Sequence, residues 1–578
     1  MATQNQKQKT VHASFPSFDG IDVYASHTGK PSTANMENWQ IRRDGSIKKR
    51  YGFRPLYALD DTVEAIWSGL IDGRFYIYLF SGGQVQYIDL SSESLMTVGT
   101  PPCTDKSSPR FFHLGGTLYL AVGGGIFAVT KTSIKKCEGY VPLIGKDWTN
   151  DLIGEIHQPL NILNRKGRFT YTVSSQASIF FRVIYPVSTI DSVLVNGIRL
   201  SSDRYYFDEL FNSVNISGLA TGDRVEIAVT FALSNASVMS ELLSTNSATV
   251  FGGISNSRVF MWDDNGKPIV YSTAFVSNSE LKASRDIYPT SDSLYFPEGY
   301  EFMVGDGKNK IMSAQRHYDR LLFFTDGDVW MADSSACGYE DLPTMNINSS
   351  IGCSSRGAVA MAGNDPVSVG DGKIYRWTSD TDELNECNAH SISDCLGDLL
   401  DNSFFKNAKV FSNRREGEVW FYDTEEAHTV WIYQHETGKW FKYTGIEADG
   451  FFDANGRVGF FKGNELYIFD PDCNTDEHED YNQSITTVFE SGLIDFGSRD
   501  TKRLAGIEFS GENCRSLRID ISPKKLKSQS ITATLGGYDH EIFEKRISSG
   551  RFTYLTLKLT SSDIRRAVIH DLTIKAKQ

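Results

Sequence analysis

Short alternating runs of apolar and polar residues, separated by glycine- and asparagine-rich turns, dominate this chain. An apolar strand, a turn, an aromatic strand such as Leu321-Leu322-Phe323-Phe324, a second turn and a third strand follow one another repeatedly. Second turns such as Gly82-Gly83 and Asp371-Gly372 are strong local signals for β-hairpins. The order recurs in seven units, at residues 62–90, 108–130, 247–274, 310–333, 355–378, 407–443 and 448–470.

The recurrence of these units predicts a β-propeller. Paired strands that return about every 40–50 residues, with no helical period between them, are typical of propeller blades and not of a parallel α/β sheet. One blade buries its faces only against its neighbours, so the units must close into a ring. We therefore expect one propeller of about seven blades, formed by residues 62–145 and 246–480.

Segments without the blade pattern predict further domains. Residues 146–245 contain strict alternation in 191–195 and 225–229, with Asn196-Gly197 as a hairpin turn, which predicts an inserted β-sandwich. Residues 481–578 contain six alternating strands and predict a C-terminal β-sandwich or jelly-roll domain. Residues 1–61 remain as an N-terminal segment. The predicted fold class is all-β throughout.

Composition agrees with this fold and limits the function. The chain has 36 Phe, 26 Tyr and 49 Gly, which suit pleated surfaces and tight turns. Its net charge of −14 argues against a general nucleic-acid binder, although an acidic conduit would let DNA slide without adhering. The start has no apolar signal region, and no apolar run is long enough for a membrane helix. Reduced, separately placed thiols are expected for the eight cysteines, at positions 103, 137, 337, 353, 387, 395, 473 and 514.

Motifs for catalysis are missing from the sequence. It contains no GxSxG, HExxH or P-loop, and we assign no catalytic residue, no metal ligand and no cofactor. Asp263-Asp264 is expected to belong to a type I′ turn rather than to an acid/base pair. The acidic stretch 470–480 is expected to be a solvated linker rather than a metal site. Three tryptophans, at positions 420, 431 and 440, are expected to pack between blades, with stacking on sugar rings as the alternative.

The N-terminal segment carries an unusual basic hairpin. A strand, the turn Asp44-Gly45 and a second strand place six cations within thirteen residues of an acidic chain. Either the hairpin is a solvated edge, or it contacts an acidic partner subunit or phosphate. We predict a subunit or adaptor interface, because arginine pairs with carboxylates in a bidentate manner. The candidate interface residues are Arg42, Arg43, Lys48, Lys49, Arg50 and Arg54.

Three segments together resemble one protein family. The segment 38–56, NWQIRRDGSIKKRYGFRPL, is followed by a blade; the pattern VNGxxLxxDxY spans 195–205; and SGLIDFGSRDTKRLAGIEFSG spans 491–511. In these segments the chain resembles the tail nozzle proteins of short-tailed bacteriophages, also called tail tubular protein B or packaged-DNA stabilisation proteins. Many members of that family are longer than this chain.

The resemblance implies a structural virion protein without enzymatic activity. It would be a homo-hexameric ring in the virion tail, assembled in the host cytoplasm beneath the portal and the head–tail adaptor. Tail fibre proteins would be further partners, and packaged double-stranded DNA would pass through the lumen during ejection. The alternatives are a glycan-binding or glycan-cleaving propeller, and a tail-fibre hub or adaptor protein.

Overall fold

β-Strands make up most of the molecule. The computed structural model describes residues 9–24, 32–150, 152–174, 180–232, 236–252, 257–290, 292–332, 342–378, 388–425, 428–538 and 540–578. Within these ranges the helices are α1 (Ala236–Ser244), α2 (Asn278–Ile287) and α3 (Asn402–Asn407), with short 3-10 turns at η2 (Ser202–Arg204) and η4 (Asp394–Leu399). The predicted all-β class is confirmed.

Seven four-stranded blades form the propeller. Blade 1 contains β6 (Val63–Ile71), β7 (Arg74–Ser81), β8 (Gln84–Asp89) and β9 (Ser94–Gly99). Blade 2 contains β10 (Arg110–Leu114), β11 (Thr117–Val122), β12 (Gly125–Val129) and β13 (Ile134–Lys136). Blade 3 contains β22 (Ser247–Phe251), β23 (Arg258–Trp262), β24 (Ile269–Ser272) and β25 (Phe302–Met303). Blade 4 contains β26 (Ile311–His317), β27 (Arg320–Thr325), β28 (Val329–Ala332) and β29 (Thr344–Asn348).

The last three blades follow in chain order, and the seventh borrows a strand from the N-terminal segment. Blade 5 contains β30 (Val359–Ala362), β31 (Asp365–Gly370), β32 (Lys373–Trp377) and β33 (Ala389–Ser391). Blade 6 contains β34 (Lys409–Asn413), β35 (Glu418–Tyr422), β36 (Thr429–Gln434) and β37 (Lys439–Thr444). Blade 7 contains β38 (Gly450–Asp453), β39 (Val458–Lys462), β40 (Glu465–Asp470) and the early strand β5 (Gly52–Ala58), which pairs antiparallel with β40.

The blades close into one ring. Each innermost strand contacts the innermost strand of the next blade in the order β6, β10, β22, β26, β30, β34 and β38, and β38 contacts β6. Blades 2 and 3 are therefore neighbours, although the inserted domain separates them in sequence. Turns with positive φ at both central positions join the second and third strands of two blades. Gly82 and Gly83, between β7 and β8, have φ of 55° and 74°, and Asp371 and Gly372, between β31 and β32, have φ of 51° and 70°. This geometry matches the twist of the flanking strands.

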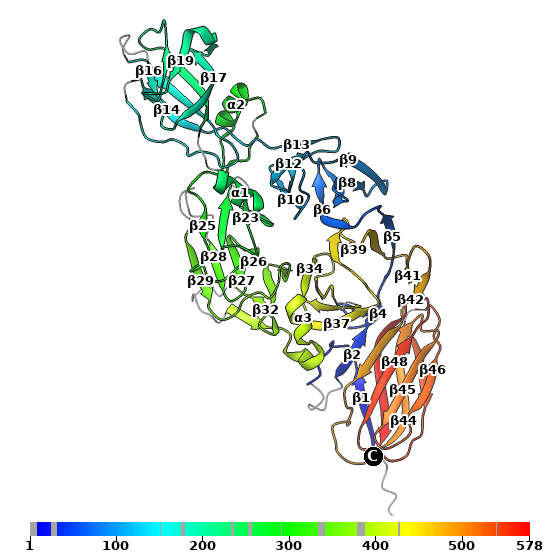
Figure 1. Ribbon diagram of the computed structural model, residues 1–578. Helices are drawn as coiled ribbons and strands as arrows, with labels where there is room; N and C mark the ends of the chain where they lie inside the picture. Colours follow the sequence, from blue (N-terminus) through cyan, green and yellow to red (C-terminus); the bar gives the residue numbers. More distant parts are fainter. Residues whose placement is uncertain are drawn as a thin grey trace, which may run out of the picture.

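The inserted domain is a β-sandwich with its own core. One sheet contains β14 (Leu143–Thr149), β15 (Lys166–Thr172), β21 (Arg224–Phe231), β17 (Val187–Val195) and β18 (Ile198–Arg199). The other contains β16 (Phe180–Arg182), β20 (Ser213–Ile216) and β19 (Tyr205–Asp208). The strands of this domain span 143–231, whereas the expected domain was 146–245. The domain ends earlier than expected because α1, which follows its last strand, packs into the core between blades 2 and 3. In Figure 1 this domain projects from the ring.

The two chain termini build the second sandwich together. Its first sheet contains β3 (Trp39–Ile41), β4 (Ile47–Lys49), β49 (Val568–Lys577), β44 (Arg503–Glu512) and β47 (Glu541–Arg546), and β1 (Thr10–Phe15) also pairs with β49. The facing strands are β2 (Thr33–Glu37), β43 (Thr487–Ser491), β48 (Leu555–Ser561), β45 (Leu517–Pro523) and β46 (Gln529–Ala533). The described residues of the segment 1–61 thus belong to this sandwich and to blade 7, and not to a domain of their own. Figure 1 places this sandwich at the opposite end of the molecule from the inserted domain.

A single sheet joins this sandwich to the propeller. Strand β2 pairs in parallel with β37, the outermost strand of blade 6, and antiparallel with β43. Blade 6 and half of the terminal sandwich therefore form one nine-stranded sheet. One hydrophobic core extends from blade 4 through blades 5, 6 and 7 into the terminal sandwich. Blade 6 and the sandwich consequently cannot move independently without breaking sheet hydrogen bonds.

Candidate functional site

The basic hairpin lies against the terminal sandwich. Trp39 pairs with Lys49, and Ile41 pairs with Ile47, across the β3–β4 hairpin. All four side chains are buried. Because alternate residues of a strand share a face, Lys49 lies on the same side as the core residue Ile47. The hairpin is therefore an integrated part of the fold, and only some of its cations reach solvent.

Arg50 is the centre of a buried polar cluster. Its guanidinium donates two hydrogen bonds to the Asp476 carboxylate, at 2.7 and 2.6 Å, and its Nε donates to Asn38 Oδ1 at 2.8 Å. It also donates to the carbonyl of Thr444 at 3.1 Å and lies 5.7 Å from the centre of the Tyr443 ring. Both charged side chains are almost completely buried, at 1% and 4% exposure. This cluster ties the hairpin to blade 6 and to β41 (Thr475–Glu477).

Lys49 and Arg50 cannot form the predicted interface, because neither reaches the surface. Lys49 Nζ donates to the carbonyl of Asp563 in the terminal sandwich. Burial and the neighbouring Arg50 lower the pKa of Lys49 to about 8. Beside it, Arg566 stacks on the Tyr51 ring at 3.7 Å. For these two residues the interface prediction is wrong, since their partners are in the same chain.

Arg54 connects blade 7 to blade 1, where the ring closes. It lies on β5 in blade 7, where its Nε donates to Asp470 at 3.0 Å. Its other nitrogens donate to Glu93, in the turn before β9 of blade 1, at 2.6 and 3.2 Å. The hydrogen bond to Glu93 raises the pKa of Arg54. The side chain is 26% exposed, so this bridge from blade 7 to blade 1 is an internal closure contact of the ring.

Of the remaining three cations, the two at the tip of the hairpin are available to a partner. Arg43 is 83% exposed, and its one ion pair is a 3.6 Å contact with Glu436. Arg42 lies 3.6 Å from Asp44, and Lys48 is half-buried. Burial lowers the pKa of Lys48, and the charges of Arg566 and Arg42 lower it further. Arg42 and Arg43, at the tip of the hairpin, are therefore the predicted interface residues that the fold leaves accessible.

A buried glutamate lies on the propeller side of the hairpin. Glu418 begins β35 and accepts hydrogen bonds from Gln40, Asn413 and Trp420, at 3.0, 3.2 and 2.9 Å. Burial raises its pKa to about 7, although the hydrogen bonds from Trp420 and Gln40 act in the opposite direction. Sequence reasoning did not identify this residue.

Glu418 should make stability depend on pH near neutrality. Between the ordinary glutamate pKa of 4.5 and about 7, the folded state keeps a proton that the unfolded state has lost. The free energy of unfolding should therefore fall as pH rises through this window, by at most about 3 kcal/mol. Glu418→Gln should remove this dependence. The measurement is urea unfolding at several pH values from 5 to 8, with Glu64→Gln, an exposed glutamate on β6, as control. A wild-type-minus-variant difference that is constant with pH would contradict this assignment.

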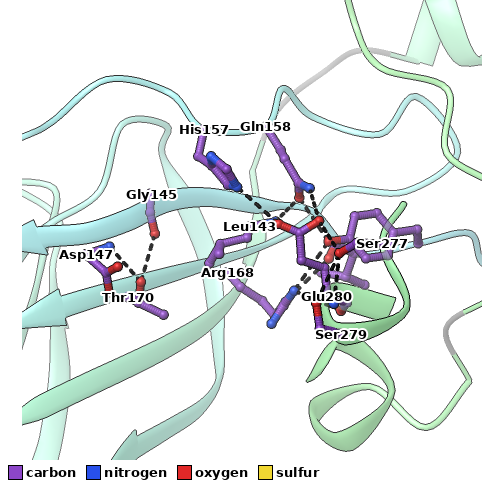
Figure 2. A network of polar contacts seen from close by, with 12 residues as sticks. Leu143, Gly145, Asp147, His157, Gln158, Arg168, Thr170, Ser277, Ser279 and Glu280 are labelled. Atoms are coloured by element: carbon purple, nitrogen blue, oxygen red, sulfur yellow. Dashed lines mark hydrogen bonds and ion pairs between the residues drawn. The ribbon is translucent and has the colours of Figure 1, made fainter. Parts of the chain in front are cut away.

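A polar network attaches the inserted domain to blade 3 (Figure 2). Glu280, in the first turn of α2, accepts from Gln158 at 3.2 Å and contacts His157 Nε2 at 3.1 Å. Ser277 caps the same helix and donates to Glu280 at 3.0 Å. Burial raises the pKa of Glu280, but hydrogen bonds from His157 and Ser277 outweigh it and the net pKa is lowered.

Arg168 strengthens this attachment from within the inserted domain. It pairs with Glu226 at 3.1 Å and reaches the carbonyl of Glu280 at 3.5 Å. The side chain is 2% exposed. Because both sides of the junction supply hydrogen-bonded, partly buried groups, the inserted domain is held in one orientation near α2.

The other chemical candidates have structural roles. Asp264 lies 3.7 Å from Arg356 and accepts from Asn265 at 2.9 Å. Residues 263–266 form a turn, but the type I′ prediction is wrong, because none of its residues has positive φ. Trp420 is buried against Phe451 and Phe469 of blade 7, as expected for packing between blades.

The acidic stretch 470–480 is more ordered than a solvated linker. Its strand β41 pairs with β42 (Asn482–Ser484), and Asp476 is the buried partner of Arg50. Among the residues that the structure describes, no group of histidine, cysteine, aspartate and glutamate could hold a metal ion. The six cysteines within these ranges are free thiols, and Cys337 and Cys387 lie outside them. No described helix is long and apolar enough to cross a membrane.

Comparisons with known proteins add little to this picture. No protein-family model matches the chain, and no curated protein matches it. Among solved structures, the chain is similar to the WD40 domain of SCAP from fission yeast, with 9% identity, a TM-score of 0.34, and coverage of 72% of this chain and 97% of that chain. A chain from the structure of the mitotic checkpoint complex has 9% identity and a TM-score of 0.33, and the match covers 75% of this chain and 95% of that chain. A glycoside hydrolase has 10% identity and a TM-score of 0.23, and the match covers 90% of this chain and 99% of that chain. Scores this low carry no argument, so the propeller assignment depends on the strand pairing itself.

Proposed function

We propose that this chain is a non-enzymatic structural protein of a bacteriophage virion, which forms the tail nozzle ring and conducts DNA during genome ejection. The observation that carries the proposal is how the chain fastens its domains together. The basic hairpin joins the terminal sandwich to the ring, β2 continues blade 6 into that sandwich, and a polar network fixes the inserted domain to blade 3. A conduit under the force of passing DNA requires such fixed domains.

The segments that carry the resemblance lie at these positions. Residues 38–56 contain the hairpin, the Arg50 cluster and the start of the closing strand β5. Residues 195–205 form the β17–β18 hairpin and the connection to β19 in the inserted domain, and 491–511 lead from β43 into β44 of the terminal sandwich. Charge supports the same proposal, because a net −14 on each subunit would keep DNA phosphates from adhering to the wall of the channel.

The proposal predicts a defined oligomer. Native mass spectrometry of the purified full chain should give a hexamer, and negative-stain microscopy should show a ring with a central channel. A monomer that binds or hydrolyses glycans in a screen would favour the alternative propeller function and contradict the nozzle proposal.

The hairpin tip should contribute to this assembly. Arg42→Glu with Arg43→Glu should shift the oligomer to smaller species, because both side chains are exposed and would face acidic partner surfaces. The monomer should stay folded, since exposed charges change stability by less than about 1 kcal/mol. The measurements are native mass and circular dichroism. The matched control is Lys545→Glu with Arg546→Glu, an exposed basic pair on β47. Loss of duplex DNA binding with unchanged assembly would instead indicate a phosphate contact.

A further inference from the structure

Arg110 is a buried arginine that forms no direct ion pair with any described carboxylate. It is the first residue of β10, the innermost strand of blade 2, and it is 8% exposed. Its Nη2 donates to the Thr245 hydroxyl at 2.7 Å and its Nη1 to the Ser108 carbonyl at 3.4 Å. Its Nε is buried and has no hydrogen-bond partner, and no described carboxylate lies within ion-pair distance of the guanidinium.

An arginine in this state is unusual. Burying a charge without an opposite charge costs several kcal/mol, and a buried donor without an acceptor adds to that cost. Burial and the charge of Arg356 lower the pKa of Arg110 to about 9, and the charge of Asp263 offsets only part of this shift. The fully covered Nε cannot reach a ligand, but the two terminal nitrogens carry four N–H groups and make only the two hydrogen bonds named above.

The guanidinium forms part of the wall of a pocket that contains hydroxyl groups. The pocket has a volume of about 420 Å³ and lies between the β9–β10 loop, the Gly123-Gly124 turn and α1. Ser108 and Ser240 line it, and their hydroxyls make no hydrogen bond with any described residue. Asp105 also lines it, but its carboxylate accepts two hydrogen bonds from Ser107, at 2.9 and 2.8 Å. The pocket therefore offers one unpaired cation and two unused hydroxyl donors.

We propose that this pocket binds an oxyanion of the phosphate class, held by Arg110 with Ser108 and Ser240. Phosphate suits this set of donors, because its several acceptor oxygens can accept from a planar guanidinium and from hydroxyls together. The pocket is larger than one phosphate group, so a small phosphorylated molecule also fits. The site lies in the propeller, remote from the basic hairpin, and does not depend on the virion function.

The test uses the full chain with inorganic phosphate, adenosine monophosphate and citrate as probes in isothermal titration calorimetry. Phosphate should bind saturably. Arg110→Gln should weaken binding at least about tenfold, the size expected for a lost charge-assisted hydrogen bond. Tighter binding of adenosine monophosphate would show that the site takes a carried phosphate, and equal binding would show that the free ion is sufficient.

A second pair of variants keeps the test decisive if Arg110→Gln does not fold. Ser240 and Ser237 are both exposed on α1, but only Ser240 lines the pocket. Ser240→Glu should weaken phosphate binding at least about tenfold by repulsion, whereas Ser237→Glu should leave it within about twofold. No saturable phosphate binding, equal loss in the two serine variants, or citrate binding as tight as phosphate would each overturn the proposal.

Discussion

Replacing Arg50 with alanine is expected to lower the free energy of unfolding by about 3–5 kcal/mol, because it leaves the Asp476 carboxylate buried and unpaired. In the same step Asn38 Oδ1 would lose one of its two donors, and the Thr444 carbonyl would lose its hydrogen bond from Arg50. The measurement is urea unfolding, with hydrogen exchange used to locate the opened segment. Exchange should rise first in β41 and in the β3–β4 hairpin, which the Arg50 cluster connects.

Two further variants separate the effect of breaking the buried Arg50–Asp476 ion pair from the effect of removing one positive charge. Arg43→Ala removes an exposed arginine from the same hairpin and should change stability by less than about 0.5 kcal/mol. Arg50→Met combined with Asp476→Leu removes both buried charges and should recover part of the loss. If Arg50→Ala proves as mild as Arg43→Ala, the cluster does not hold the hairpin to the ring.

Phe53→Ala is expected to open the propeller at blade 7 and to cost about 3–5 kcal/mol. Phe53 lies on β5, is 1% exposed, and packs edge-on against Phe460, Tyr467 and Phe469. Because β5 pairs with β40 and Phe53 supplies these aromatic contacts, loss of the Phe53 side chain should weaken the closure selectively. Hydrogen exchange should accelerate in β5 and β40 before it does so in blades 3 and 4.

The control for this variant is an exposed apolar residue. Leu70 lies on β6 of blade 1 and is 62% exposed, so Leu70→Ala should be almost neutral in the same unfolding experiment. A Phe53→Ala protein that unfolds uniformly, with no early exchange in β5 and β40, would show that the seventh blade is not the weak point of the ring.

The blades were predictable because their signals are local. Glycine and aspartate pairs such as Gly82-Gly83 and Asp371-Gly372 define hairpins within a few residues, and all seven predicted units coincide with blades. The partners of the N-terminal segment were not predictable in this way. Arg50 and Asp476 are 426 positions apart, and nothing in either neighbourhood indicates the other.

One signal for the buried part of the hairpin was present in the sequence. Ile47 and Lys49 are two residues apart in a strand, so they share a face, and a core position for Ile47 implies a buried position for Lys49. A run of consecutive cations instead suggests a solvated surface. The burial of Arg110 had no such signal, because it depends on where α1 lies, and α1 follows the inserted domain.

The strand that closes the ring is synthesised well before the strand with which it pairs. Strand β5 ends at residue 58 and β40 begins at residue 465, so about 400 residues separate them. At about 5–20 residues per second, translation leaves β5 without its partner for about 20–80 s. During this interval Phe53 and the hairpin beside it are exposed on the ribosome, and the nascent chain presents an unpaired strand edge. Efficient production of the protein should therefore depend on chaperones that bind nascent chains and on the rate of translation through the first six blades.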